Sequence, residues 1–333
     1  MTSSPSNGIL VIDGPTAEKL VSIEEAIELA EAALRSTSDG TAQQDIRRTL
    51  ALPGMTGSCL SVMYGSAADT EPFGAKVQTV YPQNFDHGRP SHQGGILLFD
   101  RETGRPAALI NASAVTGMRT PAASAVATRA LARSEATELA LIGYGEQAAR
   151  HIETISAVRA ISRVRVWGRN PDKAKAFAEA QTKRGIKTIP FETARHAVEG
   201  ADIVCTVTSA KLPVLMGEWL TPGTHVNAVG ASVAALQEVD LECVKRSRIW
   251  VDYMPMAMAA ASDIFVPLHK GIIGPEQLIG EIGAALTGTL PGRTSTSEIT
   301  LYRSLGVPAQ DMVFANFIFH KARDLGLGVE VSL

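Results

Sequence analysis

The feature that most constrains the fold is a turn near the middle of the chain that joins a strand pattern to a helical one. Residues 139–148 read Leu-Ala-Leu-Ile-Gly-Tyr-Gly-Glu-Gln-Ala, so an apolar run of strand length ends at Gly143 and a helical pattern follows. Another strand pattern comes at residues 163–167, and the two patterns then alternate in steps of roughly 20 to 30 residues. This alternation predicts a parallel sheet with right-handed helical crossovers.

The turn has the G-x-G-x-x-A spacing of a dinucleotide-binding loop. Gly143 permits the tight turn, Gly145 lets backbone N–H groups approach a pyrophosphate, and Ala148 allows the helix to pack closely on the strand. We therefore predict a Rossmann-type domain with these cofactor-binding residues: Gly143, Tyr144, Gly145, Glu146, Gln147 and Ala148. The alternative is a tight strand-to-helix turn that binds no ligand.

The end of the next strand bears on the choice of cofactor. An acidic residue there binds the ribose 2′-hydroxyl of NAD, whereas a basic residue suits the 2′-phosphate of NADP. Gly168 and Arg169 stand at that point and Asn170 follows, which favours NADP(H) and leaves NAD(H) possible. In the alternative interpretation, Arg169 is a solvated residue at the helix entry and NAD is bound through Asn170.

Three more candidate cofactor contacts lie where later strand patterns end, because ligands of open α/β sheets bind outside the carboxyl ends of the strands. Thr208 and Ser209 follow the apolar pattern at residues 201–207. Val229 stands at the end of the pattern that begins at residue 224. We expect all three side chains near the dinucleotide.

The N-terminal part of the chain has a different pattern. Residues 16–36 predict an amphipathic helix or a helix pair. Short strand patterns between residues 46 and 111, separated by Gly, Pro, Asn and Asp, predict a mixed or antiparallel sheet with a hairpin that turns at Gly104 and Arg105. A helical pattern follows at residues 112–132.

Three further elements are expected toward the C-terminus. Residues 275–288 predict a helix, residues 297–304 a strand or turn, and residues 309–326 a final amphipathic helix. Together the patterns predict an α/β protein in which a Rossmann-type domain is joined to a mixed α+β domain.

Composition excludes several classes of partner. The 333 residues include 31 Lys and Arg against 34 Asp and Glu, a net charge of −3, so no basic field is available for nucleic acid or anionic membranes. Three scattered cysteines and seven histidines show no metal-ligand spacing, so no metal site or disulfide framework is expected. No apolar run approaches the roughly 20 residues of a membrane span, and residues 1–14 show no signal-peptide pattern, so we expect a cytoplasmic protein.

Nearly the whole chain resembles the ornithine cyclodeaminase and mu-crystallin family. The segments that carry the resemblance are GAKV at 74–77, PSHQ at 90–93, AVTGMRTPAA at 114–123, GYGEQA at 143–148, GEWL at 217–220, HVNAVGAS at 225–232 and SEITLYRSLG at 297–306. The resemblance implies a homodimer. It also implies a substrate-binding and dimerisation domain of residues 1–115 with 307–333, and a Rossmann domain of residues 116–306.

The resemblance further implies which side chains bind an amino or imino acid. Family members hold the substrate carboxylate through an Arg on an early strand, a Lys and a helical Arg, which correspond here to Arg47, Lys76 and Arg119. Guanidinium groups bind carboxylates bidentately, and a lysine ammonium can pair with one and deliver a proton. Arg48 is an alternative to Arg47, and each of these cations could instead form a surface ion pair. Arg119 stands among small residues, so few other partners are expected for it.

One position departs from the cyclodeaminases of the family. They carry an Asp directly after the Gly-Ala pair, where this chain has Gly230-Ala231-Ser232. A serine hydroxyl is no base near neutral pH, so ammonia loss would lack its expected base. Ketimine reductases similar to mu-crystallin share a Ser there, so the reductive branch fits better.

The sequence thus predicts an NAD(P)H-dependent reductase of a small α-imino acid, such as 1-pyrroline-2-carboxylate or 1-piperideine-2-carboxylate, or an amino acid dehydrogenase, with hydride transfer at C2. Lys76 is the predicted proton donor and Ser232 a partner of the imine nitrogen or of a bound water. His92 is expected in the pocket wall, as a structural residue rather than an acid. A cyclodeaminase-type lyase that uses NAD catalytically and a non-catalytic NADP-binding protein remain alternatives.

Overall fold

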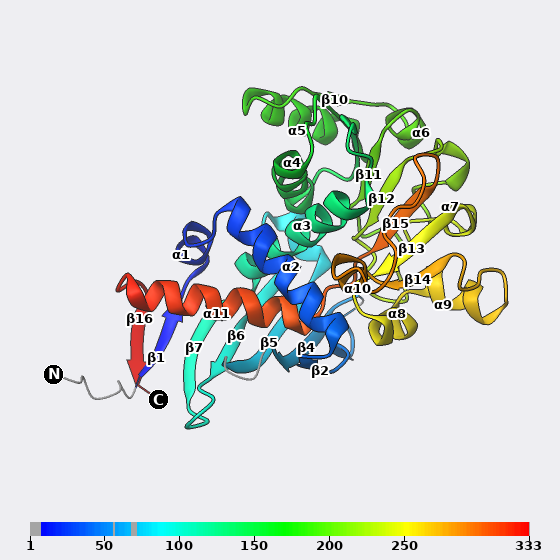
Figure 1. The fold of residues 1–333 in the computed structure, drawn as a ribbon. Coiled ribbons are helices and arrows are strands. Elements are labelled where there is room, and N and C mark those ends of the chain that lie inside the picture. The colour runs from blue at the N-terminus through cyan, green and yellow to red at the C-terminus, as the bar shows by residue number, and fades with distance from the viewer. Residues whose placement is uncertain (1–7, 56, 68–71, 333) are drawn as a thin grey trace. The chain divides into compact units, whose positions relative to one another are not determined.

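The computed structural model describes residues 8–55, 57–67 and 72–332 (Figure 1). Residues 1–7 lie outside the described residues, and they belong to the segment 1–14 for which no signal peptide is expected. The chain divides into two units, the first formed by residues 1–119 with 307–333 and the second by residues 120–306. The first boundary between the units thus falls after Arg119. The boundary expected from the sequence was after residue 115.

The first unit is built on a mixed sheet, as predicted. Its strand order is β16-β1-β7-β6-β5-β4-β2, and β3 pairs with β4. The pair β1–β7 is parallel and the other pairs are antiparallel. The strands are β1 (Gly8–Ile12), β2 (Gln43–Gln44), β3 (Arg48–Ala51), β4 (Cys59–Ser66), β5 (Phe73–Val80), β6 (His92–Phe99), β7 (Pro106–Asn111) and β16 (Val329–Ser332).

Helix α11 (Pro308–Asp324) covers one face of this sheet. The other helices of the unit are α1 (Gly14–Lys19), α2 (Ile23–Asp39) and the short 3₁₀ helix η1 (Pro82–His87). The predicted helix pair is confirmed, and α2 begins with a capping box in which Ser22 and Glu25 exchange side-chain and backbone hydrogen bonds. The last helix, α11, packs on β4, β5 and β6, and α2 packs on α11 (Figure 1).

Alternation along the strands separates a buried face from an exposed one. On β5, Lys76 and its neighbours two residues away are buried, whereas Phe73 and Val77 point to the other side. Tyr64 and Leu109 share that side, because both lie in the cross-strand row that runs through Ala75 of β5. Tyr64, Phe73, Val77 and Leu109 are about 40% exposed and define what we call the open sheet face.

The second unit contains the predicted parallel sheet. The strand order is β10-β9-β8-β11-β12-β15-β13-β14, all in parallel register. The order reverses between β8 and β11, which is the point where doubly wound sheets bind ligands. The strands are β8 (Glu138–Ile142), β9 (Arg163–Trp167), β10 (Thr188–Pro190), β11 (Ile203–Thr206), β12 (His225–Ala228), β13 (Ser247–Val251), β14 (Leu278–Glu281) and β15 (Ile299–Arg303).

The helices of the second unit connect these strands. Helix α3 (Ala112–Leu131) begins in the first unit and ends in the second. The others are α4 (Glu146–Val158), α5 (Pro171–Lys183), α6 (Ala194–Val198), η2 (Gly217–Trp219), α7 (Leu241–Arg246), α8 (Met254–Ala260), α9 (Ser262–His269) and α10 (Ile282–Leu286). None of the helices in the described parts of the chain is long and apolar enough to span a membrane, and the cytoplasmic location stays a prediction.

Two C-terminal expectations need correction. The helix predicted at residues 275–288 is wrong in its first half, where the strand β14 forms instead. Pairing with β13 overrides the local helical pattern, and Gly280 has a φ of 145°, which no helix accommodates. The final helix α11 is not amphipathic, because its polar residues Gln310, Asp311 and Asn316 are as buried as its apolar ones. The strand-or-turn segment is a strand, β15, between β12 and β13.

Candidate functional site

A buried ion-pair cluster lies in the first unit, where β5, α3 and α11 meet. The fully buried Lys76 Nζ is 2.7 Å from Asp311 Oδ1 and 3.3 Å from Thr116 Oγ1. Arg119 Nε is 3.5 Å from the same Asp311 Oδ1, and its Nη1 donates to Gln310 Oε1 at 3.3 Å. The surface ion pairs considered for Lys76 and Arg119 are therefore wrong, and so is the expectation that Arg119 has few partners.

The structure distinguishes Arg47 from Arg48. Arg47 directs its Nε to Met63 Sδ at 3.5 Å, and Met63 stands opposite Lys76 in the β4–β5 register, so Arg47 is on the side of the sheet that carries Lys76. Arg48 is exposed and pairs with Asp45 at 3.0 Å. Only Arg47 is thus placed to act together with Lys76.

Burial and neighbouring charge set the protonation of this cluster. Desolvation lowers the pKa of Lys76 to about 8; Asp311 opposes that change, while Arg119 and Arg47 add to it. Desolvation and the same three cations lower the pKa of His92 to about 4. His92 is therefore neutral near pH 7, which agrees with a structural rather than an acidic role, and its Nδ1 lies 2.9 Å from Ser91 Oγ.

Several polar atoms of the cluster make no hydrogen bond. Among the described residues, Asp311 Oδ2, Arg119 Nε and Gln310 Nε2 are buried and make no hydrogen bond. Buried polar atoms of proteins are nearly always hydrogen-bonded, and leaving one unpaired costs about 1–3 kcal/mol. The cluster thus has two cations that share one carboxylate, and polar atoms beside them that make no hydrogen bond.

Asp311 and Gln310 were not among the residues predicted from the sequence. Both are on the last helix, more than 190 positions from Arg119 and Lys76, so no local spacing connects them. The signal was present only as polar residues within an otherwise apolar helical pattern.

The turn after β8 has the geometry that a dinucleotide requires. Gly143 has a φ of 122°, and a Cβ there would lie 2.9 Å from Val207 O, so no other residue fits easily. Gly145 caps helix α4 without any side-chain hydrogen bond, and a Cβ on Gly145 would meet no atom within 4 Å. The space beside Gly145 at the N-terminus of α4 is therefore open, as pyrophosphate binding at a helix N-terminus requires.

The predicted cofactor residues after β9 differ in their surroundings. The Tyr144 ring packs against Gly168, so any side chain at position 168 would collide with it. Arg169 is exposed and makes no ion pair or hydrogen bond within the described part of the chain. Asn170 Oδ1 accepts from Lys173 N at 2.9 Å as the N-cap of α5, so part of its hydrogen-bonding capacity is already used.

The ends of β11 and β12 carry the remaining candidates. These two strands are neighbours, so the residues that follow them, Thr208 and Ser209 on one side and Val229 and Ser232 on the other, gather at one edge of the sheet. Ser209 is exposed, Ser232 is half-buried and Val229 is buried. Glu146 is exposed in the first turn of α4, and Gln147 Oε1 is buried without a hydrogen bond in the described structure.

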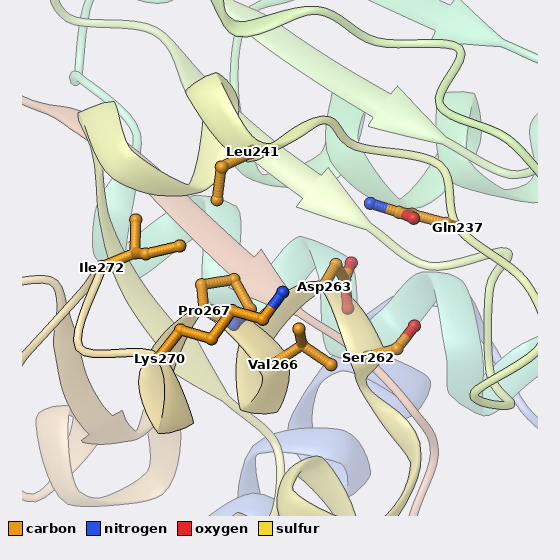
Figure 2. Close-up of a pocket in the computed structure, with 8 residues that line it drawn as sticks. All are labelled: Gln237, Leu241, Ser262, Asp263, Val266, Pro267, Lys270 and Ile272. Atoms are coloured by element: carbon orange, nitrogen blue, oxygen red, sulfur yellow. The ribbon is translucent and has the colours of Figure 1, made fainter.

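A separate cavity of about 240 Å³ in the second unit contains none of these candidates (Figure 2). It is lined by Gln237, Leu241, Ser262, Asp263, Val266, Pro267, Lys270 and Ile272. The described residues include no group of three His, Cys, Asp or Glu side chains that could hold a metal ion.

Comparison with known proteins identifies the fold and the family. The model of the ornithine cyclodeaminase/mu-crystallin family matches residues 13–326. A Delta(1)-pyrroline-2-carboxylate reductase of Bacillus cereus is 35% identical over 326 residues, 97% of this chain and 100% of that protein.

Two solved structures extend this similarity. Delta(1)-pyrroline-2-carboxylate reductase of Thermococcus litoralis, in complex with NADH and L-proline, has a TM-score of 0.93 and 35% identity, covering 97% of this chain and 100% of that one. An archaeal alanine dehydrogenase dimer with bound NAD has a TM-score of 0.90 and 31% identity, covering 97% and 99%. The chain belongs to the ornithine cyclodeaminase/mu-crystallin family.

Proposed function

We propose that this protein is an NAD(P)H-dependent reductase of a small cyclic α-imino acid, with 1-pyrroline-2-carboxylate and 1-piperideine-2-carboxylate as the first substrates to test. The observation that carries the proposal is the buried Lys76–Asp311–Arg119 cluster with its unpaired polar atoms. The open N-terminus of α4 and the reductases among the relatives support it. A similar alanine dehydrogenase structure supports amino acid dehydrogenation, the reverse type of reaction, as the second candidate.

The cationic residues of the first unit bind and protonate the substrate in this proposal. Arg119 and Arg47 pair with the carboxylate, since guanidinium groups match its planar geometry. Lys76 Nζ holds the proton that the imine nitrogen takes up, and Asp311 keeps that ammonium charged and oriented. Ser232 hydrogen-bonds the imine nitrogen or a bound water, and His92 contributes to the pocket wall as a neutral group.

The second unit holds the dinucleotide. Backbone N–H groups of the turn from Gly143 to Ala148 and the start of α4 bind the pyrophosphate, with Tyr144, Glu146 and Gln147 beside it. Thr208, Ser209 and Val229 contact the cofactor from the ends of β11 and β12. The bound cofactor supplies the hydride that adds to C2. Arg169, after the end of β9, favours NADPH over NADH because its exposed guanidinium suits a 2′-phosphate, and Asn170 stands next to it as a further cofactor contact.

We also propose that the protein is a homodimer. The open sheet face is a group of apolar side chains on neighbouring strands, each about 40% exposed, and such patches mark association sites. Burial of this face against a second copy would remove the apolar surface from water.

The function is tested by incubating the protein with NADPH or NADH and each cyclic imino acid. We expect one reduced dinucleotide to be consumed per imino acid, followed by its absorbance, with the cyclic amino acid as product. Release of ammonia from ornithine or lysine without net dinucleotide consumption would instead identify a cyclodeaminase. Dinucleotide binding without turnover of any of these compounds would indicate the non-catalytic alternative.

The role of Lys76 predicts a pH dependence. The folded-state pKa of Lys76 is lowered to about 8, so the protonated form is lost above that pH and kcat/KM for imino acid reduction should fall there. Asp311→Asn removes the charge that raises this pKa, so the fall should move to lower pH by about one unit or more, with activity at pH 8 reduced about tenfold or more. Glu31→Gln, which breaks the surface pair with Arg35, is the control that should leave the profile unchanged. An unshifted profile in Asp311→Asn would exclude Lys76 as the proton donor.

The cofactor preference predicts the effect of Arg169→Ala. Loss of a charged partner for the 2′-phosphate should raise the KM for NADPH about 10- to 100-fold and leave the KM for NADH nearly unchanged. Lys175→Ala removes an exposed charge from helix α5, which begins shortly after Arg169, and should change neither KM value. Equal effects of Arg169→Ala on both cofactors would contradict the NADP preference.

The dimer predicts the effect of Val77→Asp on the open sheet face. A charge in the centre of an apolar interface should convert the dimer to a monomer, as measured by sedimentation equilibrium. Leu212→Asp changes a side chain that is 76% exposed on the second unit, and this variant should stay dimeric. A monomeric native protein, or a dimeric Val77→Asp variant, would rule out this interface.

A further inference from the structure

A single buried carboxylate joins the loops that follow β11 and β12. Glu238 is 1% exposed and accepts five hydrogen bonds. Its Oε1 accepts from Thr208 N at 2.6 Å and from Thr208 Oγ1 at 2.7 Å. Its Oε2 accepts from Gly230 N at 2.7 Å, Thr206 Oγ1 at 3.0 Å and Ala231 N at 3.1 Å. The two loops are thus held together through one side chain.

The two loops approach each other too closely for any residue but glycine at position 230. A Cβ there would collide with the backbone of Thr208 and lie 2.7 Å from Glu238 Oε1. Three backbone N–H groups point into this small space and donate to the carboxylate. Gly230 N also donates to Thr206 O at 3.1 Å, so without the carboxylate the N–H groups of Thr208 and Ala231 would lose their acceptor.

A second charged group holds the opposite side of the β12 loop. The fully buried Arg303 donates from Nη1 to Ala228 O at 3.3 Å and from Nη2 to Ala231 O at 2.5 Å. Asp263, which lines the cavity in Figure 2, accepts from Arg303 Nε at 2.9 Å. The segment 228–231 is therefore fixed from its N–H side by Glu238 and from its carbonyl side by Arg303.

We infer that Glu238 is a positioning residue for the dinucleotide site. It fixes Thr208 directly, and by fixing Gly230 and Ala231 it sets the conformation of Val229 before them and Ser232 after them. Thr208 and Val229 are proposed to contact the cofactor, and Ser232 is proposed to contact the imine. The strand order of the sheet reverses next to β11, which Thr208 follows. The inference rests on the proposed dinucleotide site, but it does not depend on which substrate is reduced.

Glu238→Gln tests this inference with a nearly isosteric change. An amide NH₂ cannot accept a hydrogen bond, so at least two of the five donors lose their partner and the loops must separate. We expect the dissociation constant of NADPH or NADH, measured by fluorescence titration without substrate, to rise about tenfold or more. The KM for the dinucleotide should rise in parallel, with a smaller change in the KM for the imino acid.

Asp202→Asn is the matched control at the opposite, amino end of β11. Asp202 accepts from Thr137 N at 2.8 Å and Glu138 N at 3.0 Å, so it also holds backbone N–H groups, but at the amino ends of β8 and β11. Asp202→Asn should lower the thermal unfolding temperature and leave the dinucleotide dissociation constant nearly unchanged. Equal weakening of dinucleotide binding in both variants would show that Glu238 only stabilises the fold and would overturn the inference.

If Glu238→Gln does not fold, Thr206→Val provides the test of the inference. This variant removes one donor and keeps the backbone N–H groups paired, so we expect a few-fold rise in the dinucleotide dissociation constant, and no rise would count against the inference. A native protein that binds the dinucleotide but reduces no imino acid would refute the proposed function and leave the Glu238 comparison valid. A native protein that binds neither dinucleotide would overturn the inference itself.

Discussion

The Asp311 carboxylate connects three segments of the first unit that are far apart in the sequence. It pairs with Lys76 of β5 and Arg119 of α3, and it belongs to the last helix of the chain. Removing an ammonium from water without a partner costs several kcal/mol, so Lys76 depends on this pairing to stay charged in its buried position. Because one carboxylate serves two cations, the cluster retains positive charge for an anionic ligand. The same interaction thus explains why α11 packs with polar residues inward, and it supports the proposal that the cluster binds a carboxylate.

The buried charged residues Glu238 and Arg303 of the second unit bind backbone groups. Glu238 and Arg303 do not form part of an ion cluster for a ligand; they satisfy backbone groups of two loops at the carboxyl edge of the sheet. Burial raises the pKa of Glu238, and the hydrogen bonds from Thr208 and Thr206 together with the charge of Arg303 oppose that rise. The loops that follow parallel strands have few neighbours to pair with, so a buried side chain supplies the missing acceptors and donors. The two loops are therefore joined to each other at the carboxyl edge of the sheet.

Local patterns predicted most of the fold but not the interactions that complete the candidate site. The strand–turn–helix at Gly143 and the alternation after it were recognised because each rests on residues adjacent in the chain. The helix predicted at residues 275–288 failed where pairing of β14 with β13 replaced the local preference. The choice between Arg47 and Arg48 could not be made from spacing, because it depends on which residue lies beside Met63 and which pairs with Asp45.

The sequence by itself determined the class of fold and the place of the dinucleotide turn, because both depend on residue type and on spacing within one or two elements. Its resemblance to the family added Lys76 and Arg119 as candidate ligands of a small anion. Only the tertiary structure showed that Asp311 and Gln310 join those cations and that Glu238 holds the loops after β11 and β12. The physical reason is that a buried charge needs a partner of opposite charge or several hydrogen bonds, and the folded chain supplies them from segments that the sequence keeps far apart.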